Sequence, residues 1–235
     1  MRVVLVLLGL VILGLGLTTL NFRQHAKTAR VRADSVAGAA DSIRFADSVL
    51  KARNTALTAA LDTQLAAASR QKETELAQLR STYDELVNSM KDEIAQGQIQ
   101  ITRLADRLSV TMVDKILFPS GEAGITPAGL RILHRVGDVL KTTEGKTIRV
   151  EGHTDNVAIS DKLRSTYATN WELSTTRATN VVRFLQDSVG IDPARLQAVG
   201  LAEYHPIATN ATVQGRGQNR RIEIALLPLE PGREP

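Results

Sequence analysis

The chain has 235 residues, of which 43% are hydrophobic and only 3% aromatic. The 29 basic and 25 acidic residues give a net charge of +4 without a long single-sign run or a basic stripe interleaved with aromatics, so nucleic-acid binding is not indicated. The absence of cysteine excludes disulfides, thiolate metal ligands, a cysteine nucleophile and a lipid-modified cysteine.

The first segment of the chain is almost wholly apolar. Residues 3–20, VVLVLLGLVILGLGLTTL, carry no charge and reach the ~18 residues at which a membrane-spanning helix becomes plausible. No Ala-x-Ala cleavage site follows, so we expect residues 1–22 to form an uncleaved single-span membrane anchor, with a cleaved signal peptide as the alternative. Four basic residues follow at positions 23–32 and one precedes it, a distribution that taken alone would keep the C-terminal part in the cytoplasm.

Residues 33–108 have the pattern of a long helix. They contain no proline and almost no glycine. One apolar register recurs every seven residues at Val36, Ile43, Leu50 and Leu57. A second register contains Leu76, Leu79, Tyr83, Leu86, Met90, Ile101, Leu104 and Leu108. Such spacing predicts a coiled-coil seam, or the face of a long helix that packs on another helix, with a solvated, partly frayed helix as the alternative. About 75 helical residues extend ~110 Å, which suits a spacer or an oligomerisation element.

The composition changes near Leu117, and strand and helix patterns alternate from there to Leu227. We expect strands at 110–118, 147–152, 195–199 and 221–227, and helices that begin at Pro127 and at Asn170. Thr126 is the expected N-cap of the first helix, and Gly190 stops the second. This order predicts an α/β sandwich of βαβαβ type over residues 110–227, with helices on one or both faces of a small sheet. Residues 228–235 are expected to be a flexible, proline-rich tail.

The stretch VEGHTDN, residues 150–156, carries three candidate chemical groups. In a strand, Glu151, His153 and Asp155 face one side. A metal site is not indicated, because alternate residues of one strand rarely converge and no second histidine is close in sequence. Catalysis is not indicated either, because no serine lies in a Gly-x-Ser-x-Gly turn. A binding pocket remains, and so does a polar strand end that only caps the fold.

The helix after this stretch favours the binding pocket. Arg177 falls inside the apolar stripe of that helix, where an unpaired buried arginine would cost about 3–5 kcal/mol. It must therefore reach solvent, pair with a carboxylate or hold an anionic ligand. Because the strand end lies near the start of the next helix, Asp155 and Arg177 are expected to line one pocket. A carboxylate facing a guanidinium suits a zwitterion.

The blocks EGHTDN, NWELSTTRATNVVRFL and QGRGQNRRIEI resemble the OmpA C-terminal-like family of peptidoglycan-binding domains, most closely its MotB type. The resemblance covers roughly residues 117–227. It implies non-covalent binding of the diaminopimelate of peptidoglycan stem peptides, without enzymatic activity or a cofactor. On the matching motif positions it implies ligand-binding roles for Asp155, Arg177, Thr154, Asn170, Leu173 and either Arg220 or Arg221. Each of the last two can also be a simple strand-end charge.

The resemblance also implies a place in the cell. MotB-type stator proteins carry an aspartate in their membrane span, whereas residues 3–20 contain no ionisable group, so an ion-conducting role is not expected. We expect a single-pass membrane protein whose C-terminal domain lies in the periplasm and tethers the membrane to peptidoglycan. A periplasmic or outer-membrane-associated protein is the alternative if the leader is cleaved. The second functional hypothesis is a coiled-coil scaffold of a larger envelope complex, and the coil would also allow a homo-oligomer.

Overall fold

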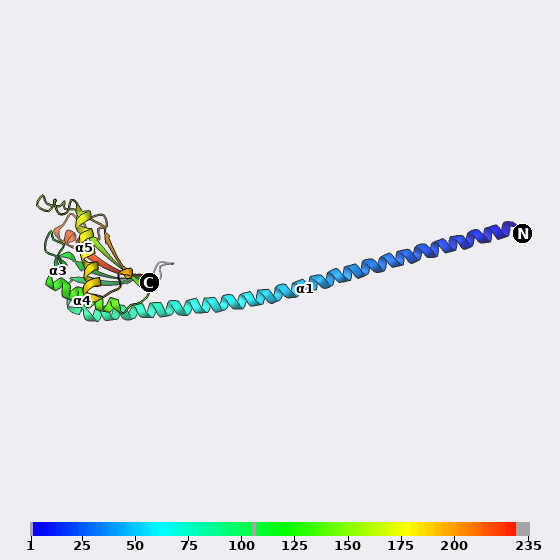
Figure 1. The fold of residues 1–235 in the computed structure, drawn as a ribbon, viewed down its shortest axis with the longest axis horizontal. Coiled ribbons are helices and arrows are strands. Elements are labelled where there is room, and N and C mark those ends of the chain that lie inside the picture. Colours follow the sequence, from blue (N-terminus) through cyan, green and yellow to red (C-terminus); the bar gives the residue numbers. More distant parts are fainter. Residues whose placement is uncertain (1, 105–106, 229–235) are drawn as a thin grey trace. The chain divides into compact units, whose positions relative to one another are not determined.

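The computed structural model describes residues 2–104 and 107–228, with side chains from residue 15 onward. The chain divides into two compact units, the first ending at Ser69 and the second beginning at Arg70. The first unit is a stretch of helix α1, which runs over Arg2–Ser89. The second unit holds the last turns of α1 and a mixed α/β domain (Figure 1).

Within the first unit, α1 exposes its apolar side chains. The heptad positions Val36, Ile43, Leu50 and Leu57 are each more than half exposed. At ~1.5 Å per residue, the helix up to residue 69 extends about 100 Å. The predicted long helix is confirmed for this part of the chain. Coiled-coil pairing through the heptad stripe stays a prediction.

The structure describes only part of the two predicted terminal segments. The predicted anchor covers residues 1–22, and no side chain before residue 15 is described. Across the described residues, no helix is both long enough and apolar enough to cross a bilayer. Of the predicted tail, residues 228–235, only Pro228 is described, as the last residue of a strand. The membrane anchor and the flexible tail therefore stay predictions.

The prediction of a helix up to residue 108 is wrong. After α1 come the short helix α2 (Lys91–Ala95) and the strand β1 (Ile99–Leu104). Gly97 lies between them with φ +66°, a left-handed conformation that glycine adopts without strain. In β1, apolar residues alternate with polar ones, as in the segment IQIT, and this two-residue period is that of a strand.

Several residues of the second apolar register pack inside the C-terminal domain, whereas Leu76 and Leu104 are exposed. Leu79, Leu86 and Met90 are buried and belong to the same core cluster as the sheet and its helices. Burial of each such side chain contributes about 1.5–3 kcal/mol. The hydroxyl groups of Thr82 and Thr143 lie 3.3 Å apart in the same interface. These turns of α1 are thus part of the domain rather than of a coiled coil.

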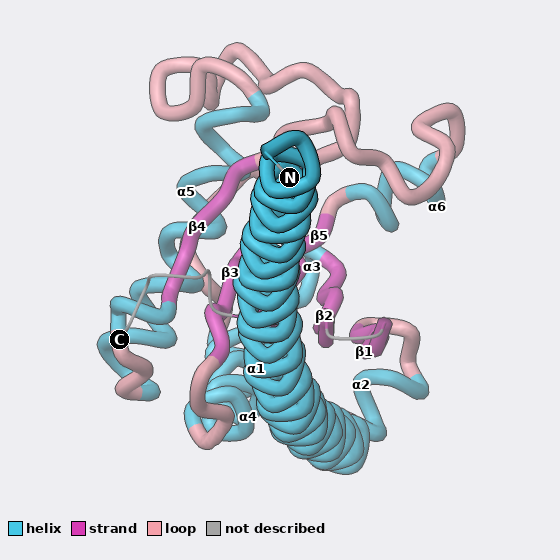
Figure 2. The backbone as a smooth tube through the Cα atoms, turned by 90° about the vertical axis from the view of Figure 1, so that its right-hand side faces the viewer, coloured by secondary structure: helices cyan, strands magenta, loops and turns pink. Residues whose placement is uncertain are grey.

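The domain is built on one mixed five-stranded sheet. Its other strands are β2 (Arg107–Val113), β3 (Lys146–His153), β4 (Leu196–Gly200) and β5 (Arg221–Pro228). The strand order is β1-β2-β5-β3-β4, which Figure 2 shows from right to left. Strands β3 and β4 are parallel, and the other neighbours are antiparallel. The α/β architecture is confirmed, with β1 as an additional edge strand.

Two helices pack on the core face of this sheet. Helix α4 (Pro127–Lys141) begins as predicted, because the Thr126 side chain accepts a hydrogen bond from the Gly129 amide at 3.0 Å. Helix α5 (Asn170–Phe184) continues into a π-helical turn that ends at Gly190. Two shorter helices, α3 (Asp114–Leu117) and α6 (Val213–Asn219), precede α4 and β5. Residues 114–118, predicted as strand, thus begin with a helical turn.

The strand pattern separates an apolar face from a polar face. The core face carries Leu108, Val110, Met112, Ile148, Val150, Ile222, Ile224 and Leu226, all buried in one cluster with α4 and α5. Because successive residues of a strand point to opposite faces, the residues between them share the other face. That second face carries Arg107, Ser109, Arg149, Glu151, His153, Arg221 and Glu223.

Candidate functional site

Two glycines bring the first turns of α5 against the ends of β3 and β4. Gly152 and Gly200 are partners in the register of these strands. A Cβ atom on Gly152 would lie 2.2 Å from the Ser174 carbonyl oxygen, and one on Gly200 would lie 2.0 Å from the Thr175 hydroxyl oxygen. Because neither strand carries a side chain there, α5 lies directly on the sheet. The residues that follow β3 therefore meet the beginning of α5.

Asp155 is held in place at this junction. Its Oδ1 accepts a hydrogen bond from the Val157 amide at 3.0 Å. Asn170, the first residue of α5, donates from its side chain to the carbonyl oxygens of Asp155 and Val157, at 3.3 and 3.1 Å. A capping box between Thr169 and Glu172 fixes the start of α5. The turn after β3 is thus tied to the helix that follows it.

The second carboxylate oxygen of Asp155 pairs with Arg220. The contact joins Asp155 Oδ2 and Arg220 Nη1. Arg220 is the residue directly before β5, so the pair links the ends of two neighbouring strands. The side chain of Arg220 is 41% exposed, whereas that of Asp155 is 7% exposed. This pair has a buried acidic end and an accessible basic end.

Arg177 pairs with a different carboxylate. Its Nη1 lies 2.9 Å from Asp114 Oδ1, and its Nε donates to the Glu122 carbonyl oxygen at 2.8 Å. The guanidinium also lies over the Phe118 ring, 4.9 Å from its centroid. Arg177 is only 3% exposed. Of the three options for an arginine in an apolar stripe, the structure has the one in which a carboxylate neutralises it.

The two ion pairs form one electrostatic unit, which we call the charge cluster: Asp114, Asp155, Arg177 and Arg220. Burial raises the pKa of the Asp114 carboxyl, and the nearby guanidiniums of Arg177 and Arg220 oppose that rise. Burial lowers the pKa of the Arg177 guanidinium, and Asp114 opposes that fall. Because an arginine keeps its proton at neutral pH, the cluster places two positive guanidiniums beside two carboxyl groups.

The remaining predicted residues divide between two places. Thr154 is buried beside Asp155 and its amide donates to the Ala202 carbonyl at 2.9 Å, while its hydroxyl has no hydrogen-bond partner among the described residues. Leu173 is buried in the first turn of α5. Arg221 points elsewhere, because both its Nη atoms lie 3.3 Å from the His205 carbonyl oxygen. The structure thus brings Arg220, but not Arg221, to Asp155.

Sequence reasoning missed two residues that organise this site. Asp114 directly follows β2, and its position after a strand was the available signal. Asn219 is fully buried; its side-chain oxygen accepts from the amides of Ile207 and Ala208, both at 2.9 Å. Asn219 directly precedes Arg220, so these hydrogen bonds tie the loop after β4 to the segment that positions Arg220.

The second unit is thus a small α/β domain with two ion pairs at one end of its sheet. The OmpA family model matches residues 117–220. This domain of the chain belongs to the OmpA family and is of the MotB type.

Individual relatives agree with this assignment. Motility protein B of Bacillus subtilis is 31% identical over 151 residues, which cover 64% of this chain and 57% of that protein. Peptidoglycan-binding protein ArfA of Mycobacterium tuberculosis is 36% identical over 111 residues, covering 47% of this chain and 32% of ArfA. The chain thus spans less than two-thirds of the length of either curated relative.

A solved structure extends the likeness to the fold. The cell wall anchor of the T6SS from Pseudomonas aeruginosa matches with a TM-score of 0.56 and 33% identity. The match covers 61% of this chain and 97% of that one. None of these three descriptions names an enzyme.

Proposed function

We propose that the C-terminal domain binds peptidoglycan non-covalently and tethers the chain to the cell wall. The OmpA-family fold supports this function, and so do a relative described as peptidoglycan-binding and a similar structure described as a cell wall anchor. The observation that carries the proposal is the charge cluster, which offers a carboxylate and accessible guanidinium side by side.

The ligand group we propose is the diaminopimelate of the stem peptide. The far end of its side chain is a zwitterion, with an ammonium and a carboxylate on one carbon. Asp155 accepts the ammonium, and Arg220 takes the carboxylate. Arg177, held by Asp114, adds a fixed positive charge behind them. The free hydroxyl of Thr154 and the side chains of Asn170 and Leu173 complete the site, and Arg221 supports it structurally.

We propose that the N-terminal part of the chain connects the peptidoglycan-binding domain to the membrane. A membrane anchor at residues 1–22 would place the helix of the first unit between membrane and wall. Residues 23–69 of that helix would then extend about 70 Å beyond the anchor, a length suited to a spacer in the envelope. The domain then lies in the periplasm, on a single-pass protein of the cell membrane, or at the outer membrane if the leader is cleaved.

Competition with defined peptides tests the ligand. Full-length protein should sediment with purified sacculi, and a stem peptide ending in meso-diaminopimelate should release it. The same peptide with lysine at that position lacks the second carboxylate, so it should compete at least about tenfold less well. Equal competition by both peptides would rule out diaminopimelate as the recognised group. Failure to sediment at all would rule out the wall-binding function.

A second function, as a coiled-coil scaffold of a larger envelope complex, is supported by the exposed heptad stripe of α1. Full-length protein should then sediment as an oligomer in analytical ultracentrifugation. The double variant Ile43→Asp/Leu50→Asp should be a monomer, because it places charges in the seam. The double variant Ser48→Asp/Thr55→Asp adds the same charges off the seam and should remain oligomeric. A monomeric wild-type chain would contradict the scaffold hypothesis.

A further inference from the structure

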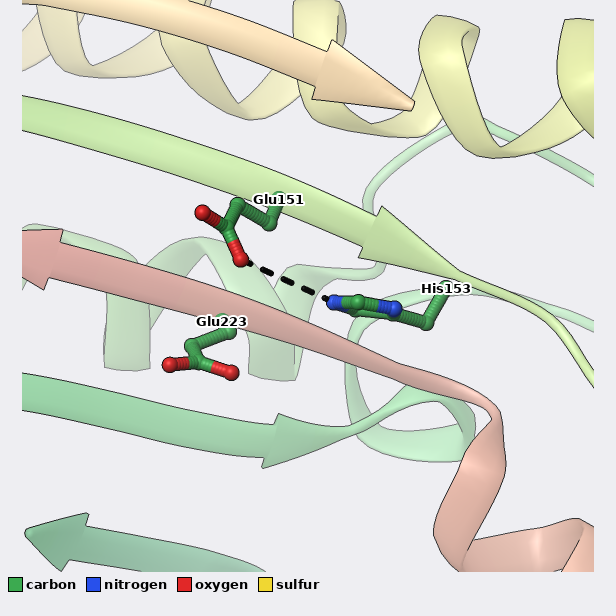
Figure 3. Close-up of side chains that lie close together, drawn as sticks. All are labelled: Glu151, His153 and Glu223. Carbon is green, nitrogen blue, oxygen red and sulfur yellow. Dashed lines mark ion pairs between the residues drawn. The ribbon is translucent and has the colours of Figure 1, made fainter. Parts of the chain in front are cut away.

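A second group of polar side chains lies on the polar face of the sheet. Glu151 of β3 and Glu223 of β5 stand directly opposite each other in the strand register. His153 follows two residues along β3, on the same face. One ligand atom from each of the three residues lies within 4.8 Å of the others, and Figure 3 shows Glu151 and His153 turned toward each other, with Glu223 on the neighbouring strand. The group shares no residue with the charge cluster.

The histidine of this group has free coordinating capacity. His153 is 3% exposed, and neither ring nitrogen has a hydrogen-bond partner among the described residues. Its Nε2 lies 3.9 Å from Glu151 Oε2, too far for a hydrogen bond. Within the described part of the chain, the buried ring therefore has nitrogens without partners beside two carboxylates.

We propose that Glu151, His153 and Glu223 bind a divalent transition-metal ion, with Zn²⁺ as the representative ion. An imidazole nitrogen with two carboxylate oxygens is a donor set that Zn²⁺ accepts at about 2.0–2.2 Å from each atom. The three donors must close by roughly an ångström to reach such distances, a movement within reach of glutamate side chains. Open coordination positions go to water or to His205, whose ring centroid lies 6.4 Å from that of His153.

Arg107 competes with the ion for the same oxygens. Its Nη2 lies 2.9 Å from Glu223 Oε1 and 3.9 Å from Glu151 Oε2. Two carboxylates directly opposite each other repel, and in the metal-free protein Arg107 offsets this repulsion. The Arg107 side chain is 41% exposed, so it can swing into solvent when a cation arrives. An open hollow lined by these residues gives an ion access to the group. Removal of the Arg107 charge should therefore tighten metal binding.

Metal titration of the tag-free, EDTA-treated full-length chain tests this site. Calorimetry with ZnCl₂ should give one ion per chain, and Zn²⁺ should raise the melting temperature. Glu151→Gln and Glu223→Gln should each weaken binding at least about tenfold, whereas Arg107→Gln should strengthen it. Glu144→Gln, an exposed glutamate outside the group, is the matched control and should bind as wild type.

Two results would overturn the metal site. The first is the absence of saturable Zn²⁺ binding by the wild-type chain, which depends on no variant. The second is unchanged affinity in both glutamine variants. If either variant fails to fold by circular dichroism, the visible spectrum of Co²⁺ added to the wild-type chain decides the matter. Bands of a cobalt ion with nitrogen and oxygen ligands support the site, and the spectrum of free aqueous Co²⁺ overturns it.

Discussion

Replacement of Arg177 by methionine is expected to destabilise the C-terminal domain by about 3–5 kcal/mol, because it leaves Asp114 buried without its partner. Removal of the other charge of the pair, by Asp114→Asn, should also destabilise the domain, since it leaves the Arg177 guanidinium buried beside a neutral amide. The double variant Arg177→Met/Asp114→Asn should be more stable than the sum of the single losses predicts. Urea unfolding of the full-length chain, followed by circular dichroism, measures all three.

A neighbouring arginine controls for the loss of charge and helix propensity. Arg183 lies on the same helix and is exposed, so Arg183→Met should change the free energy of unfolding by less than about 0.5 kcal/mol. If Arg177→Met is equally mild, the Arg177–Asp114 pair is not buried in solution. If the single losses simply add in the double variant, the two side chains do not interact.

Asp155→Asn should remove most of the affinity for sacculi while leaving the domain folded. The amide keeps an oxygen that can accept from the Val157 amide, so the turn after β3 is retained. It has no charge for an ammonium ligand, and a hydrogen bond to a charged group is worth about 1.5–3 kcal/mol. That loss corresponds to about a 10- to 100-fold weaker affinity. The bound fraction after sedimentation with sacculi gives the affinity, and thermal unfolding confirms the fold.

The same substitution elsewhere in the same loop is the control. Asp161 is exposed, and among the described residues it pairs only with Arg164, in a surface ion pair of i,i+3 spacing. Asp161→Asn changes the net charge by the same amount, so it should sediment with sacculi as wild type does. Wild-type sedimentation of Asp155→Asn would remove Asp155 from the binding site. Equal loss in both variants would indicate nonspecific electrostatic attraction instead.

The sequence was sufficient where a local rule decides the structure. Thr126 and Pro127 are a preferred N-cap and first helical residue, and α4 begins there. Arg177 in an apolar stripe predicted a buried charge that needs compensation, and Asp114 supplies it. The alternating residues of the final strand predicted β5, within one residue of its observed end. In each case the signal lies within a few neighbouring positions.

The sequence was insufficient where distant segments decide the structure. The segment after Gly97 alternates apolar and polar residues, and we predicted it as the end of a helix. In the structure it is the strand β1, which pairs with β2. The partner of Arg177 comes from another element, 63 positions away by residue number (177 − 114), so spacing could not identify it. Glu223 completes the group around His153 only because β5 lies next to β3. Strand order is a property of the folded chain, and a single sequence does not display it.

Because Leu79, Leu86 and Met90 are buried in the domain core, the segment that folds as one unit is longer than the segment that the family model matches. The family match begins at residue 117 and ends at residue 220. A fragment cut at those limits would lose β1, β2, the whole of β5 and the helical turns that cover the core. Its remaining strands would expose unpaired edges and apolar side chains, the conditions under which proteins aggregate. Autonomous folding therefore requires the stretch from about residue 70 through the end of β5 at residue 228, all of which lies in the second compact unit.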